Sequence, residues 1–338
     1  MPAPDKLHIR QIALEIHGGC NYRCPMCPQA EGRERDFLKK LPFDIFAKTI
    51  EEAKRYGLEA VSLQGSGEPT LHPEMPRYVR FVKEQGLKCI SLTNGYALTP
   101  KLSRALIEAG LDALRVSAVG YNRETYHQWM SRDAFEQVRE QVREFVRIRN
   151  ELGGKTEFTL YHLITDSSRV VHEVEQYRRN WIEYCGCPGE IWLMHNWGGS
   201  YTDTPYGRPH TTKRSCGRPR APYLTVRAGG RDGHRAAVVP CCFVLGRDSE
   251  TTLGHLDTQT IAEVVAGAPY EALRHNHDIG NFDAIPYCKD CDQLYDLPES
   301  LVWTNIPGKE YGQSKYLKDL DYRQWSGEVE NATVQSEN

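Results

Sequence analysis

The feature that most constrains the fold is a regular alternation of short apolar runs and amphipathic segments over the first two hundred residues. The segments between the runs repeat apolar residues at helical spacing, as Phe135, Val138, Val142 and Phe145 do. Strands separated by helices pair in parallel, and six are too few to close an eight-stranded barrel. We therefore predict an α/β fold with a partial (β/α)6 barrel over residues 1–200. Its strands are expected at residues 12–18, 60–65, 87–95, 112–120, 157–165 and 190–198.

The pattern changes beyond residue 200, which predicts a second, smaller domain over residues 201–300. It contains a loop-rich segment, a β-hairpin near Gly229 and Gly233, a helical run over 258–277 and a C-K-D-C segment at 288–291. Residues 301–338 form a C-terminal extension, whose polar end we expect to be mobile.

Composition limits the partners and the compartment. The formal net charge of −3 gives no electrostatic reason to expect nucleic acid or an anionic membrane as a partner. No apolar run reaches the length of a membrane span, and the first residues lack the apolar stretch of a secretory signal. We expect a cytoplasmic protein, whose 11 cysteines serve as thiols or metal ligands rather than as a disulfide framework.

Three of these cysteines follow the first predicted strand with the spacing C-x3-C-x2-C, at Cys20, Cys24 and Cys27. They lie where the carboxyl ends of parallel strands place a ligand. Thiolates suit zinc or iron–sulfur sites. One interpretation is a zinc site that His17 completes, and another is a set of unpaired core cysteines. The interpretation that we favour is a [4Fe–4S] cluster held at three irons, with the fourth iron open to a ligand.

The segment C-N-Y-R-C-P-M-C resembles the cysteine loop of radical S-adenosylmethionine (SAM) enzymes, and the resemblance extends over roughly residues 10–200. It implies a TIM-like partial barrel and a SAM-binding [4Fe–4S] cluster. In that family the amino and carboxylate groups of SAM chelate the open iron. The reduced cluster then cleaves SAM to a 5'-deoxyadenosyl radical, which abstracts a hydrogen atom from the substrate.

Residues at other strand ends match the SAM-binding positions of the same family. G-S-G-E-P at 65–69 resembles its glycine-rich segment, with Ser66 in place of a second glycine. The position before the third cysteine is usually aromatic in the family and is Met26 in this chain. The SAM-binding residues that the resemblance implies are Met26, Gly65, Ser66, Gly67, Glu68, Thr93, Asn94 and Ser117.

Four further cysteines, Cys216, Cys241, Cys288 and Cys291, resemble the shortened auxiliary-cluster region, called twitch, of the SPASM/twitch radical SAM subgroup. The resemblance implies that they hold a fully coordinated auxiliary [4Fe–4S] cluster. A zinc ribbon is the alternative, because C-x2-C with two distant cysteines also suits structural zinc.

Within this subgroup the layout is similar to aminoglycoside-pathway dehydrogenases and epimerases of the butirosin aminocyclitol dehydrogenase type. The resemblance implies removal of a carbinol hydrogen from a sugar-like or aminocyclitol substrate, with the auxiliary cluster accepting an electron as a ketone forms. Candidates for the proton-accepting base are His195, His162 and Glu15, which end predicted strands. A hydrogen atom returned by Cys242 would make the reaction an epimerisation instead.

Two other functions are also compatible with the sequence. One is modification of a ribosomally made peptide, and the other is a non-catalytic, zinc-binding interaction protein. For the enzyme we expect as partners a small polar, aminocyclitol-like or aminoglycoside-like substrate and an electron donor such as flavodoxin or ferredoxin.

Overall fold

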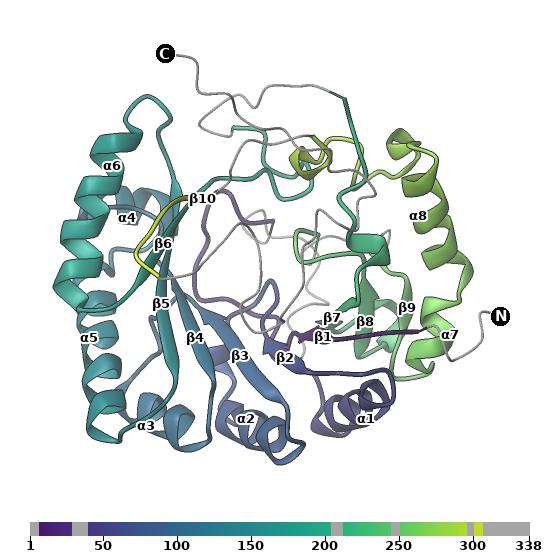
Figure 1. Cartoon of the computed structure of the whole chain (residues 1–338), viewed down its shortest axis with the longest axis horizontal. Coiled ribbons are helices and arrows are strands. Elements are labelled where there is room, and N and C mark those ends of the chain that lie inside the picture. The colour runs from purple at the N-terminus through teal and green to yellow at the C-terminus, as the bar shows by residue number, and fades with distance from the viewer. Residues whose placement is uncertain (1–6, 29–39, 204–211, 245–250, 296–300, 307–338) are drawn as a thin grey trace.

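The computed structural model describes residues 7–28, 40–203, 212–244, 251–295 and 301–306. Within them, ten strands form one sheet in the order β10-β6-β5-β4-β3-β2-β1-β7-β8-β9 (Figure 1). The first six strands are parallel neighbours in chain order. They are β1 (Gln11–Leu14), β2 (Ala60–Leu63), β3 (Lys88–Thr93), β4 (Ala113–Ser117), β5 (Glu157–Ile164) and β6 (Gly189–Leu193).

Helices connect these strands and cover the convex face of the curved sheet (Figure 1). They are α1 (Phe43–Lys54), α2 (Met75–Glu84), α3 (Pro100–Glu108), α4 (Arg123–Met130), α5 (Phe135–Glu151) and α6 (Val170–Tyr177). The predicted partial (β/α)6 barrel is confirmed. Most predicted runs extend past the observed strands, because their last residues belong to the loops at the carboxyl edge.

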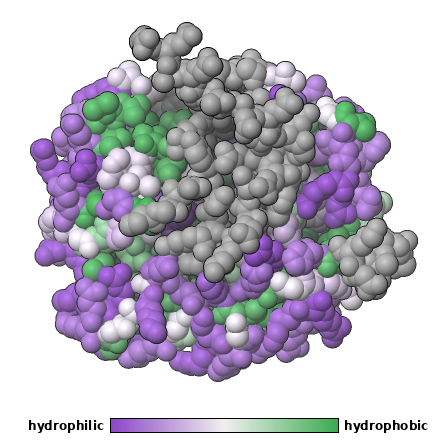
Figure 2. All heavy atoms as spheres, in the orientation of Figure 1, coloured by the Kyte–Doolittle hydropathy of each residue, from purple (hydrophilic) through white to green (hydrophobic). Residues whose placement is uncertain are grey.

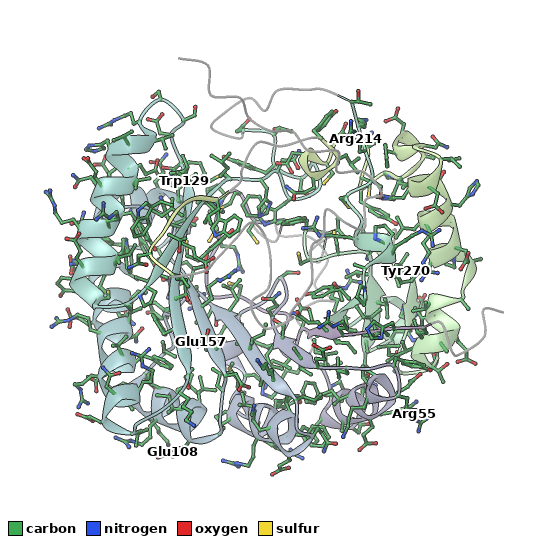
Figure 3. The ribbon with its side chains drawn as sticks, in the orientation of Figure 1. Arg55, Glu108, Trp129, Glu157, Arg214 and Tyr270 are labelled. Atoms are coloured by element: carbon green, nitrogen blue, oxygen red, sulfur yellow. The ribbon has the colours of Figure 1, made fainter. Side chains whose placement is uncertain are left out.

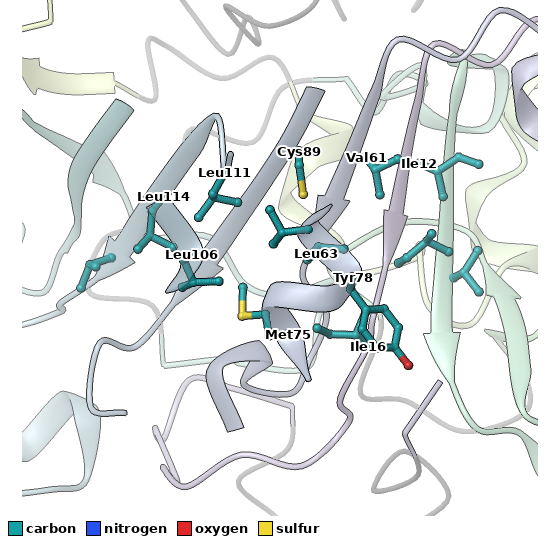
Figure 4. Packing of buried hydrophobic residues seen from close by; sticks show 14 of the residues in the cluster. Ile12, Ile16, Val61, Leu63, Met75, Tyr78, Cys89, Leu106, Leu111 and Leu114 are labelled. Carbon is teal, nitrogen blue, oxygen red and sulfur yellow. The ribbon is translucent and has the colours of Figure 1, made fainter. Parts of the chain in front are cut away.

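The core lies between the helices and the outer face of the sheet (Figure 4). Alternate strand residues, such as Ile12, Val61 and Leu114, are buried there and contact apolar helix residues such as Met75 and Leu106. Because side chains alternate between the two faces of a strand, the intervening residues face the inside of the partial barrel. This inner face therefore carries the residues available to a ligand.

The C-terminal segments extend the barrel sheet at both edges. The first strand of the predicted hairpin, β7 (Tyr223–Ala228), pairs in parallel with β1. β8 (Ala236–Val239) pairs antiparallel with β7, and β9 (Gly254–His255) pairs with β8. β10 (Leu301–Thr304) pairs antiparallel with β6, so part of the predicted extension belongs to the sheet. The expectation of a mobile end falls on residues 307–338, outside the described residues.

The helical run predicted at 258–277 is two helices, α7 (Ile261–Val265) and α8 (Ala268–Asp278). The single-helix prediction is wrong because Gly267 has extended backbone (φ −72°, ψ 152°) and serves as the N-cap of α8, with a proline in its first turn. Thr260 caps α7 in a capping box with Glu263.

Hydrophilic side chains dominate the periphery of the face shown in Figure 2. No helix in the described ranges is long and apolar enough to cross a membrane.

Candidate active site

The three cysteines of the first group lie together in the loop that follows β1. The Cys20 thiol accepts a hydrogen bond from the Tyr22 N–H at 3.5 Å, and the Cys24 thiol lies 3.8 Å from the Met130 carbonyl oxygen. Burial raises the pKa of Cys20 to about 12, and the charges of Glu68 and Cys27 add to this shift. Burial also raises the pKa of Cys24 well above its usual value, and the two neighbouring thiols raise it further. A positively charged iron cluster reverses this preference, because thiolates are the ligand form.

The glycine-rich loop 65–69 packs directly against the cysteine loop. The Glu68 N–H donates to the Gly19 carbonyl at 2.8 Å. A Cβ atom on Gly67 would lie 1.8 Å from the His17 carbonyl oxygen, so only glycine fits at this backbone approach. The sequence resemblance therefore located two loops that the fold brings into contact.

Glu68, Thr93 and Asn94 form one hydrogen-bonded network at the carboxyl ends of β2 and β3. The Glu68 carboxylate accepts from the Thr93 hydroxyl at 2.6 Å and from the Asn94 N–H at 2.7 Å. The Asn94 side-chain amide donates to Asn21 at 2.8 Å and lies 3.8 Å from the Cys20 sulfur. These predicted SAM-binding residues thus surround the first cysteine. Ser117 ends β4 at the same edge and is half-buried, whereas the Met26 side chain is buried in the main core.

Glu15, predicted as a candidate base, is held by backbone amides. Its carboxylate accepts from the N–H groups of Ser66 at 2.6 Å, Gly67 at 3.3 Å and Ala228 at 3.1 Å. It therefore ties the glycine-rich loop to β7 of the C-terminal part. With 1% of its surface exposed, Glu15 positions these loops rather than facing a substrate.

Burial raises the pKa of Glu15 from 4.5 to about 7, although its hydrogen bonds and Arg227 oppose the shift. A raised carboxyl pKa means that the folded protein binds this proton more tightly than the unfolded chain does, so stability is lost as the pH rises through 7. We expect Glu15→Gln to remove this dependence. The measurement is urea unfolding of both proteins at pH 5.5 and at pH 8. The free energy of unfolding of Glu15→Gln, relative to that of the parent, should be higher at pH 8 than at pH 5.5 by about 2 kcal/mol.

The exposed Glu108→Gln serves as the control and should show no such gain. A Glu15→Gln difference that stays constant with pH would contradict the assignment.

The second cysteine group also converges. Cys216, Cys288 and Cys291 share a small apolar cluster with Phe282 and Leu294. Burial raises the pKa of Cys288 and Cys241, and in both cases the other thiols of the group raise it further, so the four sulfurs lie within electrostatic range of one another. Arg218 opposes these shifts, which places a cation beside the group.

The end of β6 meets this second group through His195. Its ring lies 3.8 Å from the ring of Trp197 and 4.2 Å from that of Phe243, measured between centroids. Nδ1 of His195 accepts from the Trp197 N–H at 3.3 Å, which makes Nδ1 the nitrogen that carries the lone pair in the neutral ring. His195 is thus next to the segment that carries Cys241 and Cys242.

Cys242 is adjacent in the chain to the auxiliary cysteine Cys241 and to Phe243, whose ring lies 4.2 Å from that of His195 at the end of β6. Cys242 is within electrostatic range of Cys216 and Arg218 and also of Tyr161 on β5. Burial raises its pKa, so the thiol keeps its proton near neutral pH.

His162 is placed differently from the prediction. It is fully buried, its Nε2 contacts the Glu173 carboxylate at 2.8 Å, and its Nδ1 accepts from the Gly120 N–H at 3.2 Å. It stacks on Tyr177. Both ring nitrogens are engaged in the helical layer, so His162 joins β5 to α6 and does not reach the inner face.

The inner face of the sheet is less completely buried than the outer face in its middle strands. Six of its residues are half-buried, whereas outer-face residues of the same strands, such as Leu114 and Leu160, are fully buried. We call the inner side of these strands the lumen, and Figure 3 draws the side chains on both faces of the sheet. Its half-buried residues are Ile90, Leu92, Arg115, Ser117, Tyr161 and Trp192.

The sequence interpretation missed Arg115, Glu190 and Trp192 in the lumen. The available signal was a charged residue inside a strand-like run, because a charge in the middle of a buried strand requires a partner or a ligand. That signal was present for both Arg115 and Glu190.

The donor sets fit the predicted clusters. Three convergent thiols suit a cluster that keeps one open iron, and four thiols suit a closed one. Within the described ranges, no group of three or more His, Cys, Asp or Glu side chains is spaced to hold a single metal ion.

Comparison with protein families gives two matches. A model described as the radical SAM superfamily matches residues 14–171, and one described as an iron–sulfur cluster-binding domain, SPASM, matches residues 223–292. Together these domains imply a SAM-binding [4Fe–4S] cluster, an auxiliary cluster and SAM. The cofactor prediction is thereby confirmed.

Curated relatives match about two fifths of the chain. A probable GTP 3',8-cyclase of Methanococcus maripaludis is 29% identical over 140 residues, which cover 41% of this chain and 46% of the relative. A protein of the same name from Saccharolobus islandicus is 35% identical over 142 residues, covering 41% and 44%. The chain therefore spans less than half the length of these relatives.

Solved structures share the fold. The complex of BtrN with AdoMet and 2-DOIA aligns with a TM-score of 0.55 at 18% identity, over 87% of this chain and 98% of that one. Streptococcus suis SuiB bound to precursor peptide SuiA has a TM-score of 0.55 at 15% identity, over 79% and 67%. At these identities the likeness concerns the fold.

Proposed function

Because this chain is a radical SAM enzyme with a C-terminal SPASM-type iron–sulfur domain, we propose that it oxidises a carbinol carbon of a sugar-like or aminocyclitol substrate to a ketone. The observation that carries the proposal is the position of the auxiliary cysteine segment at the lumen. Cys242 is within electrostatic range of both Tyr161 and Cys216. An electron leaving a substrate in the lumen would therefore have an acceptor close by.

When bound, the first cluster and SAM supply the 5'-deoxyadenosyl radical that takes the carbinol hydrogen atom, and the auxiliary cluster takes one electron. The chain supplies the remaining functions. Cys20, Cys24 and Cys27 would hold the first cluster, while Glu68 would hold Thr93 and Asn94 in place beside it. We assign acceptance of the hydroxyl proton to His195, whose Nδ1 would exchange the hydrogen bond from the Trp197 N–H for one from the substrate hydroxyl. The reduced state of the first cluster requires an outside one-electron donor of the flavodoxin or ferredoxin class.

The proposal is tested by anaerobic assay of the reconstituted enzyme with SAM, a reductant and carbon-deuterated polyols. We expect deuterium to appear in 5'-deoxyadenosine and a ketone product that has lost one deuterium and one hydrogen relative to the deuterated substrate. GTP belongs in the panel because the curated relatives are named GTP 3',8-cyclases. Deuterium transfer from GTP alone would contradict the proposal.

His195→Ala tests the assigned base. We expect it to slow ketone formation by at least about tenfold, because general bases contribute about two to four orders of magnitude. SAM cleavage without substrate should stay at the parental rate, because His195 belongs to the end of β6. Unchanged ketone formation would remove His195 from the mechanism.

Epimerisation is the second candidate, and Cys242 favours it. Its buried thiol stays protonated and lies near Tyr161 on the inner face of β5, so an S–H hydrogen atom is available there. In deuterated water an epimerase places solvent deuterium in a product that is not oxidised. Cys242→Ala would then abolish turnover, whereas a dehydrogenase would continue to form ketone.

A further inference from the structure

The inner face of β4, β5 and β6 carries a charged pair between two aromatic side chains. Parallel register places Ser117, Tyr161 and Glu190 in one row across the three strands. Arg115 lies two residues before Ser117, and Trp192 lies two residues after Glu190, so all share the inner face. Nη2 of Arg115 is 3.2 Å from the Glu190 carboxylate, and the guanidinium is 5.3 Å from the centroid of the Tyr161 ring.

Arg115 and Glu190 differ in how far their side chains are exposed to a ligand. The Glu190 side chain is 1% exposed, and its carboxylate accepts from Trp192 Nε1 at 2.9 Å. The Arg115 side chain is 40% exposed. Its hydrogen bonds within the described ranges leave from Nη2 alone, so Nε and Nη1 keep their donors for a ligand. The lumen thus offers hydrogen-bond donors on a guanidinium that a buried carboxylate holds in place.

The side chains around Arg115 determine which chemical groups a ligand must present. Guanidinium nitrogens donate and never accept, so the ligand must present acceptor oxygens, which an ammonium group lacks. Glu190 already neutralises Arg115, so a second anion would gain less than it loses in desolvation. Tyr161 and Trp192 border the pair with aromatic rings, which favour contact with an apolar face.

We propose that Arg115 binds adjacent hydroxyl oxygens of a neutral, ring-shaped polyol whose C–H face contacts Tyr161 and Trp192. This deepens the proposed function and rests on it for the identity of the lumen as the substrate site. It selects uncharged hydroxyls, rather than an amine, a carboxylate or a phosphate, as the recognised groups. The ring then spans the three inner-face rows that carry Arg115, Tyr161 and Trp192.

Binding is measured by calorimetric titration of the anaerobic holoenzyme with SAM and without reductant, so that no turnover occurs. The probes are myo-inositol, glucuronate and glucose 6-phosphate. We expect myo-inositol to bind the parent most tightly and Arg115→Gln to weaken that binding at least about tenfold. The matched control is Arg123→Gln, which removes an exposed arginine paired with Asp133 outside the lumen. It should leave binding unchanged.

Glu190→Gln tests the charge argument. Glutamine retains a hydrogen-bond acceptor for Arg115 and Trp192 but removes the neutralising charge. We expect glucuronate and glucose 6-phosphate to gain at least about tenfold in affinity relative to myo-inositol. The two anions also separate carboxylate from phosphate recognition.

The results distinguish this inference from the proposed function. Tighter binding of either anion to the parent, no binding of myo-inositol, or equal binding by Arg115→Gln would overturn the inference even if ketone forms. Arg115-dependent binding of myo-inositol without any hydrogen transfer from polyols would sustain the inference and overturn the proposed oxidation.

Discussion

Replacing Cys20, Cys24 and Cys27 together with alanine should abolish reductive cleavage of SAM. The three thiols converge in one loop, and no other cysteine in the described ranges belongs to that group. Removing them leaves the glycine-rich loop in place but removes the iron that SAM would chelate. Iron content should fall from about eight to about four atoms per chain, because one of two [4Fe–4S] clusters is lost.

The matched control is the double replacement of Cys288 and Cys291, which belong to the other group. It should also lose about four irons but retain cleavage of SAM, while ketone formation stops. If the first variant still cleaves SAM, or if the second variant loses cleavage instead, the division of labour between the two groups is wrong.

Gly67→Ala should weaken SAM binding by more than about tenfold, because overpacking against rigid neighbours costs more than about 1.4 kcal/mol. The added Cβ would meet the His17 carbonyl at 1.8 Å and the Gly18 backbone at 2.6 Å. To remove this steric clash, the backbone that leads into Cys20 must move. The glycine-rich loop and the cysteine loop would then separate. Equilibrium binding of SAM to the reconstituted protein measures the effect.

Gly86→Ala is the control for this change. A Cβ at Gly86 meets nothing within 4 Å, and its only cost is strain from a φ of +77°. It should reduce stability slightly and leave SAM affinity unchanged. Parental SAM affinity in Gly67→Ala would show that the two loops are not rigidly joined.

The barrel was predictable because the residues that define each strand and helix lie close together in the sequence. Apolar runs and helical stripes such as that of Phe135, Val138 and Val142 report burial directly, and parallel order follows from the crossover helices. The pairing of β7 with β1 was not predictable from local patterns. It joins strands that are some two hundred residues apart in the chain, and its hydrophobic runs would equally suit a separate hairpin.

The candidate site also contains residues that local sequence motifs identified and residues that only the tertiary structure brings together. The positions of both cysteine groups and of Glu68, Thr93 and Asn94 came from a resemblance carried by short, rigid motifs. Which predicted base faces the lumen depends on strand alternation and tertiary contacts. His162 follows Tyr161 by one residue and therefore points to the opposite face of β5. The Glu15 carboxylate accepts hydrogen bonds from three backbone amides, so it holds loops in place instead of facing the lumen. Arg115 and Glu190 become a site only when β4, β5 and β6 place them together.

The most direct test is the electron paramagnetic resonance spectrum of the reduced Cys288→Ala, Cys291→Ala protein before and after addition of SAM. In that variant the cluster of the cysteine loop is the only one expected, so its signal is not obscured by the auxiliary centre. Coordination of SAM to an open iron should shift the g-values on addition of SAM. A spectrum that SAM leaves unchanged would contradict the assignment of an open coordination position.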